Sequence, residues 1–77
     1  MKPPEKFELQ VKYFQSQNYT PRDVIRRWAS ENYTAFFWDD KGPYLYIYGK
    51  KYRYECWKIQ KNDDGTEIVN VTLKKEE

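Results

Sequence analysis

The sequence predicts an α+β fold: an antiparallel sheet of about five strands with one helix packed on one face. Three observations support it. A strong helix start stands at Thr20-Pro21, apolar and polar residues alternate in segments on either side, and glycine-containing turns separate the later segments. The expected element order is β-α-β-β-β-β. The length of 77 residues fits one domain, 1–77, whose ends at 1–5 and 74–77 are expected to be flexible.

The first strand is predicted over residues 6–14, where apolar side chains fall at every second position. The helix is predicted over residues 21–32. Thr20 is a suitable N-cap, Pro21 suits the first helical position, and Asp23 places a carboxylate near the positive end of the helix. An apolar stripe at helical spacing then marks the face that should pack on the sheet: Val24, Ile25, Trp28 and Ala29.

The remaining chain reads as four strands separated by turns. The strands are expected at residues 34–38, 44–48, 52–60 and 68–73. Residues 39–43 form a turn cluster, and Gly49-Lys50 fits a two-residue hairpin turn with glycine first. The segment 63–65 fits a three-residue hairpin loop that closes on a left-handed glycine.

The two predicted hairpins make conflicting demands on the sheet. A two-residue turn at Gly49-Lys50 pairs Tyr46 with Arg53 and places both opposite the Leu45–Ile47 face. The loop at 63–65 pairs Trp57 with Val71, and by alternation Trp57 then shares the face of Arg53. Either a β-bulge near 55–57 reverses the alternation, or the sheet curls so that both faces are partly covered.

The composition argues against an enzyme. The chain has no histidine, so the commonest general base and metal ligand is missing. Its only cysteine, Cys56, lacks an activating base and is expected to be a small buried strand residue. The acidic pairs Asp39-Asp40 and Asp63-Asp64 lie in predicted turns, where aspartate is common for backbone reasons. We therefore expect no catalytic residues, no metal and no cofactor.

The N-terminal residues lack the apolar stretch of a signal peptide, and no segment is apolar enough to span a membrane. A single cysteine also allows no internal disulfide. These features predict a cytoplasmic protein in a reducing environment, without membrane contact.

Basic and aromatic residues coincide in the second half of the chain. Residues 41–61 carry six basic residues against one acidic residue, Glu55. Outward tyrosines can stack on bases and nearby lysines and arginines can hold phosphates, so this stretch predicts binding of single-stranded nucleic acid. The expected contact residues are Tyr44, Tyr46, Tyr48, Lys50, Lys51 and Arg53. A second basic patch is expected on the helix, at Arg22, Arg26 and Arg27.

Other interpretations remain open. The same tyrosines and arginines are typical of protein-binding surfaces, and an edge strand can pair with a strand of a partner. The chain would then be an interaction or inhibitor protein, for example a viral or phage accessory protein that targets a host protein. The tyrosines can also be core residues and the lysines merely solvated. Finally, regular ends and the lack of histidine also fit an engineered or de novo designed domain.

Overall fold

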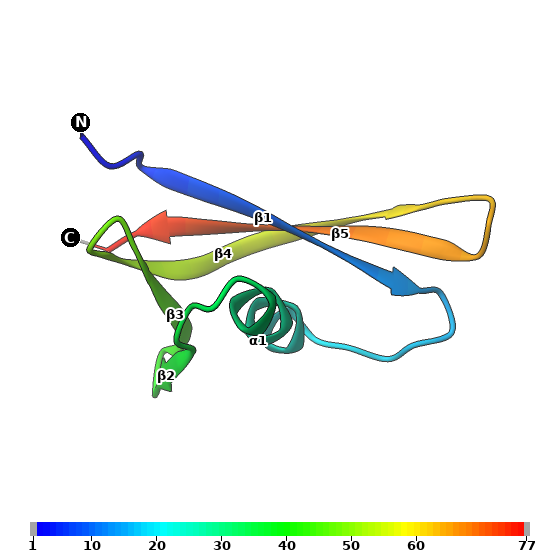
Figure 1. Ribbon diagram of the computed structural model, residues 1–77, viewed down its shortest axis with the longest axis horizontal. Coiled ribbons are helices and arrows are strands. Elements are labelled where there is room, and N and C mark those ends of the chain that lie inside the picture. Colours follow the sequence, from blue (N-terminus) through cyan, green and yellow to red (C-terminus); the bar gives the residue numbers. More distant parts are fainter. Residues whose placement is uncertain (1, 77) are drawn as a thin grey trace.

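The computed structural model describes residues 2–76 and confirms the predicted fold. The elements are β1 (Lys6–Phe14), α1 (Pro21–Glu31), β2 (Phe37–Asp39), β3 (Gly42–Ile47), β4 (Lys50–Lys61) and β5 (Thr66–Lys75). The five strands form one antiparallel sheet in the order β1-β5-β4-β3-β2, with α1 against one face (Figure 1). The first and last strands of the chain are therefore neighbours.

The start of α1 follows the predicted capping. The Asp23 N–H donates to the Thr20 hydroxyl, and the Thr20 N–H donates to the Asp23 carboxylate at 2.8 Å. This reciprocal capping box satisfies two donors that the first helical turn leaves free. Pro21 occupies the first turn, where its missing N–H costs nothing.

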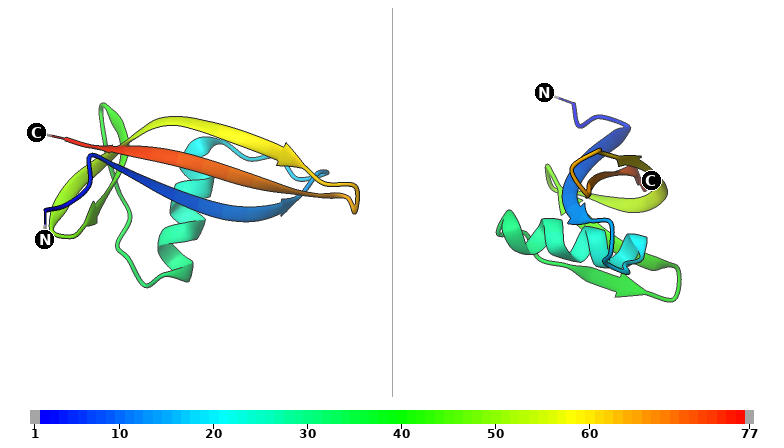
Figure 2. Two further views of the ribbon diagram at one scale, coloured as in Figure 1. Left: turned by 90° about the horizontal axis from the view of Figure 1, so that it is seen from above. Right: turned by 90° about the vertical axis from the view of Figure 1, so that its right-hand side faces the viewer.

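The core lies between α1 and the face of the sheet that we call the inner face. From the helix, Val24, Ile25 and Ala29 are fully buried there. Trp28 is half-buried and packs edge-on against Phe7 of β1, with ring centroids 5.4 Å apart. The sheet contributes Leu9, Val11, Tyr13, Leu45, Tyr52, Val69, Val71 and Leu73. The sheet curls around the helix, so that the β2–β3 hairpin lies beside α1 while the long strands pass over it (Figure 2).

The β4–β5 hairpin has the predicted register, and the bulge exists. Asn62 lies opposite Thr66, Ile59 opposite Val69, and Trp57 opposite Val71. The pairing shifts between Tyr54 and Cys56, so Glu55 is the extra residue. Because an extra residue reverses the alternation, Tyr54 and Trp57 both reach the inner face and pack against the core.

The β3–β4 turn lies one residue earlier than predicted. The turn residues are Tyr48 and Gly49, so Tyr44 and not Tyr46 pairs with Arg53. The predicted pairing of Tyr46 with Arg53 is therefore wrong by two positions. The paired side chains of β3 and β4 still lie on the predicted faces, because the predicted turn and the observed turn both contain two residues. Positive φ at Tyr48 (54°) and Gly49 (73°) is the pattern of a type I′ turn, whose twist matches the strands.

The expectation that Cys56 is buried is wrong. Its thiol is exposed, because Cys56 follows the bulge and points to the outer face, away from α1. Glu55 also points outward, and its carboxylate lies 3.0 Å from the Lys6 ammonium. Because of the bulge, the consecutive side chains of Glu55 and Cys56 both point to the outer face.

Both ends of the described chain contact the sheet. The Lys75 N–H donates to the Glu5 carbonyl at 2.8 Å, and the buried Tyr52 hydroxyl donates to the Pro4 carbonyl at 2.5 Å. The mobility of 1–5 and 74–77 stays a prediction, and Met1 and Glu77 lie outside the described residues. Within residues 2–76, no helix has the length and apolar character needed to cross a membrane.

Candidate functional site

An aromatic cluster stands on the outer face where β2 and β3 pair. It consists of Phe37, Tyr44 and Tyr46. The Phe37 and Tyr44 rings stack with centroids 5.4 Å apart, and Tyr46 meets both rings edge-on at 5.5 and 5.9 Å. Three rings in mutual contact have few alternative rotamers, so the cluster presents a fixed shape. Tyr46 is 50% exposed and Phe37 is 37% exposed, which leaves much of the cluster open to solvent.

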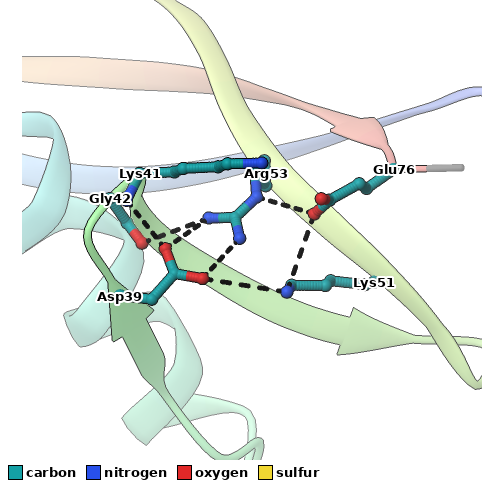
Figure 3. Close-up of polar contacts among 6 residues, drawn as sticks. All are labelled: Asp39, Lys41, Gly42, Lys51, Arg53 and Glu76. Carbon is teal, nitrogen blue, oxygen red and sulfur yellow. Dashed lines mark hydrogen bonds and ion pairs between the residues drawn. The ribbon is translucent and has the colours of Figure 1, made fainter.

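A charge clamp borders the cluster. We use this name for Asp39, Lys51, Arg53 and Glu76, which come from β2, β4 and the end of the chain (Figure 3). The Arg53 guanidinium donates to both oxygens of Asp39, at 3.0 and 2.6 Å, and to Glu76 at 2.6 Å. The Arg53 side chain is only 16% exposed. The two carboxylates accept hydrogen bonds from the guanidinium and balance its positive charge.

Lys51 completes the clamp. Its ammonium lies 3.8 Å from the Asp39 carboxylate and 3.7 Å from that of Glu76. Two cationic and two anionic side chains therefore share this corner, and their formal charges cancel. The same cations cover an aromatic ring: the Lys51 Nζ and the Arg53 Cζ lie 4.1 and 4.9 Å from the centroid of Tyr44. Cation–π attraction adds to the ion pairs in holding this arrangement.

The clamp changes the titration of its acidic members. The hydrogen bonds from Arg53 lower the pKa of Asp39 from 3.8 to about 2, and the Lys41 N–H, which also donates to this carboxylate, acts in the same direction. Arg53 likewise lowers the pKa of Glu76. The carboxylates in turn raise the pKa of Arg53, Asp39 most of all. Both carboxylates are therefore charged at any physiological pH.

The structure brings together only part of the predicted contact surface. Tyr44, Tyr46, Lys51 and Arg53 lie side by side on the outer face, as expected from the alternation. Tyr48 is instead in the turn, and its ring meets Phe7 of the inner face at 6.5 Å. Lys50 pairs with Ile47 and is exposed at the start of β4. The surface is thus smaller than predicted, and its two central cations are internally paired.

The predicted helical basic patch does not form one surface. The Arg22 guanidinium lies over the ring of Trp38, 4.6 Å from its centroid, toward β2. Arg27 lies over Tyr13 of β1 at 4.8 Å and pairs with Glu31 at 3.4 Å. Arg26 is exposed, and within residues 2–76 it makes neither an ion pair nor a cation–π contact. Two of the three arginines therefore face different neighbours on opposite flanks of the helix.

Sequence reasoning missed Phe37, Asp39 and Glu76. The first two have a signal: a two-residue turn at Asp40-Lys41 would pair Asp39 with Gly42 and Phe37 with Tyr44, as observed. Glu76 has no local signal, because it reaches Arg53 only through the register of β4 and β5 beyond the bulge. Within residues 2–76, no three Cys, Asp or Glu side chains are grouped so that they could hold a metal ion.

No protein-family model matches the chain, and neither a curated protein nor a solved structure matches it significantly.

Proposed function

We propose that the chain is a non-enzymatic binding module that contacts a protein partner through the aromatic cluster. The observation that carries the proposal is the charge clamp beside it. The positive charges of Lys51 and Arg53 are balanced by those of Asp39 and Glu76, so the four charges of the clamp cancel. Partly exposed tyrosines such as Tyr46, next to an arginine whose position is fixed by ion pairs, are typical of protein-binding hot spots.

A phosphate group would meet two obstacles at this site. Arg53 already gives its strongest hydrogen bonds to two carboxylates, and a phosphate would have to displace one of them against repulsion from the other. Tyr44 is flanked by Phe37 on one side and by the two cations on the other, so neither face of its ring is free to stack on a base. These features weigh against a nucleic-acid role for the predicted residues.

The neighbouring edge of the sheet adds a second mode of contact. β2 is the last strand in the sheet order, and among the described residues it pairs with β3 alone, so its other side is open there. A partner segment in extended conformation could pair with this edge while its side chains meet Phe37 and Tyr46. This fits a peptide-like ligand whose aromatic or aliphatic side chains pack on the cluster. The exposed thiol of Cys56 is in keeping with a reducing, intracellular location, which is part of the proposal.

Single-stranded nucleic acid is the second candidate, because Tyr46 is half exposed and two exposed lysines lie near the ends of β3, Lys41 in the turn before it and Lys50 at the start of β4. The two classes differ in salt dependence. Phosphate contacts weaken steeply with salt, whereas aromatic protein contacts do not.

The test is to pan a random-peptide library on the folded protein and to titrate the protein with labelled single-stranded DNA and RNA at about 50 and 200 mM salt. We expect peptides that bind the wild type and lose tenfold or more in affinity on Tyr46→Ala, equivalent to about 1.4 kcal/mol. Tyr33→Ala is the matched control, because Tyr33 is 99% exposed and lies outside the cluster.

Two kinds of result would overturn the proposal. One is a failed peptide selection, in which no peptide is enriched or the enriched peptides bind Tyr46→Ala as well as they bind wild type. The other is oligonucleotide binding that falls steeply between the two salt concentrations and is lost on Tyr46→Ala, which would assign the cluster to nucleic acid instead.

A further inference from the structure

The other edge of the sheet is formed by β1, the nine-residue strand at the opposite end of the order from β2. The Lys75 N–H donates to the Glu5 carbonyl, and the Gln15 N–H donates to the Gly65 carbonyl. In β1, the odd-numbered residues therefore direct their backbone N–H and C=O groups toward β5. The even-numbered residues then direct their backbone groups to the open side. Within residues 2–76, nothing hydrogen bonds to those groups of Glu8, Gln10 and Lys12.

This edge lacks several of the features that usually prevent strand-to-strand association. β1 pairs with β5 over its whole length without a bulge, and it contains no proline. In the left view of Figure 2, β1 is the outermost of the three long strands, and α1 crosses beneath it on the inner side and continues past it. The exposed side chains along the strand carry both signs of charge, which does not repel a second strand of the same kind.

We propose that β1 binds a second copy of this chain, strand to strand and antiparallel, with the two-fold axis at Gln10. In this register Glu8 lies directly opposite Lys12 of the second copy, and Lys12 lies opposite the second Glu8. Opposite charges at directly facing positions stabilise strand pairs. On the axis, Gln10 lies opposite Gln10 of the second copy, where the two side-chain amides can hydrogen bond to each other. The inner sides pair Leu9 with Val11 of the second copy.

Antiparallel registers with the axis at residues 8, 9, 11 or 12, near the middle of the strand, are poorer. Moving the axis to residue 9 places Lys6 opposite Lys12, and moving it to residue 8 or 12 places Glu8 or Lys12 opposite itself. Moving it to residue 11 leaves Glu8 opposite Phe14, without a charged partner. Like charges that face each other directly destabilise a strand pair. The axis at Gln10 is the register within this range that pairs every Glu8 with a Lys12.

The proposed dimer is independent of the proposed function, because β1 and the aromatic cluster lie at opposite edges of the sheet. Pairing through β1 would join two five-stranded sheets into one continuous sheet. The order would run from β2 of one copy to β2 of the other, and both aromatic clusters would stay uncovered.

The experiment is sedimentation analysis of the purified chain over a wide concentration range, with folding checked by circular dichroism. We expect a concentration-dependent dimer. Glu8→Lys or Lys12→Glu alone places like charges opposite each other twice and should weaken the dimer roughly tenfold or more. The double variant Glu8→Lys with Lys12→Glu restores opposite charges and should dimerise like the wild type. Lys58→Glu, on the outer face of β4, is the charge control and should have no effect.

A second variant tests the backbone pairing. Gln10→Pro removes an N–H that points to the open side, so it leaves the β1–β5 ladder intact but abolishes the central hydrogen bonds of the dimer. We expect a folded monomer. A wild type that stays monomeric at every concentration would overturn the proposal. So would a dimer that tolerates Gln10→Pro, or a double variant no better than the single variants.

Discussion

Arg53 holds together three segments that are distant in the chain. It bonds to Asp39 of β2 and to Glu76 at the end of the chain from its own position in β4. The edge hairpin and the last described residue are therefore fixed to the same guanidinium. Much of the rigidity of the aromatic cluster should depend on this one residue, because Phe37 and Asp39 belong to the same short strand.

Replacing Arg53 by methionine should release the Asp39 carboxylate. We expect the pKa of Asp39 to rise from about 2 toward its ordinary value of 3.8, because its strongest hydrogen-bond donor is lost. Carbon-13 NMR of the carboxyl group measures this directly. Lys51→Met is the control and should shift the pKa less, since Lys51 acts on Asp39 through its charge at 3.8 Å, whereas Arg53 also donates two hydrogen bonds. Equal shifts in the two variants would contradict the assigned role of Arg53.

The same carboxylate sets the sign of the pH dependence. Because the pKa of Asp39 is lowered by folding, its contribution to stability is complete above about 3.8 and is lost as the pH falls toward 2. Glu76 acts in the same direction. In acid unfolding, wild type should therefore lose stability through this range more steeply than Arg53→Met.

Among the elements, β4 contains the feature on which the fold depends most, the bulge at Glu55. It lets Leu45 and Tyr52 at one end of the sheet and Trp57 and Val71 at the other face the same helix. Deleting Glu55 should turn either Tyr54 or Trp57 to the wrong face, so we expect the cooperative unfolding transition to disappear. Urea denaturation followed by tryptophan fluorescence measures it.

Glu55→Ala is the matched control for the deletion. It keeps the extra residue and removes only the exposed ion pair with Lys6, which should cost less than about 1 kcal/mol. If the deletion unfolds no more easily than Glu55→Ala, the bulge does not determine the fold.

The turn between β3 and β4 is a place where the sequence is locally unfavourable. Tyr48 has a φ of 54°, a left-handed conformation that costs an ordinary residue roughly 1–2 kcal/mol. Tyr48→Asn creates the Asn-Gly pair preferred in type I′ turns and should raise the free energy of unfolding by about 1 kcal/mol. Tyr48→Ala should give no such gain, because alanine has the same backbone preference as tyrosine. A loss of stability in Tyr48→Asn would show that the contact with Phe7 outweighs the strain.

These two elements also show how far the sequence determines the structure. The bulge was predictable from parity, because the two hairpins required opposite faces, although curling of the sheet was an equal alternative. The structure has both. The turn was misplaced because the sequence rule puts glycine first, whereas here glycine follows a tyrosine in a left-handed conformation. Local propensity does not reveal that the rest of the hairpin imposes this conformation.

The candidate site was harder to predict than the fold. Alternation alone places Tyr44, Tyr46, Lys51 and Arg53 on one face, and this part was correct. The neutrality of the charge clamp could not be predicted, because Glu76 meets Lys51 only after the bulge and the β4–β5 ladder have set its position. Counting charges along the chain finds the basic residues of β4. It does not reveal that strand pairing places Asp39 and Glu76, from other segments, beside them.

At the scale of the whole molecule, the two proposals assign different tasks to opposite edges of one sheet. β2 and the aromatic cluster form the edge that meets a partner, and β1 forms the edge that meets a second copy. The long strands between them lie over α1 as a continuous layer (Figure 1). A dimer through β1 would therefore place two identical binding surfaces at the far ends of one rigid sheet.

This arrangement predicts avidity. On a surface densely coated with a peptide selected by the wild type, both clusters of a dimer can bind at once, and the second binding event is intramolecular. At a protein concentration between the dimer dissociation constants of wild type and Glu8→Lys, wild type should then dissociate at least about tenfold more slowly than Glu8→Lys, because such linkage commonly gains two or more orders of magnitude. On a sparsely coated surface, or with the peptide free in solution, the two proteins should bind alike, because Glu8 is far from the cluster. Equal dissociation at high density, with wild type dimeric in solution, would mean that the two clusters cannot reach neighbouring ligands. A difference that persists with free peptide would mean instead that β1 and the cluster are not independent.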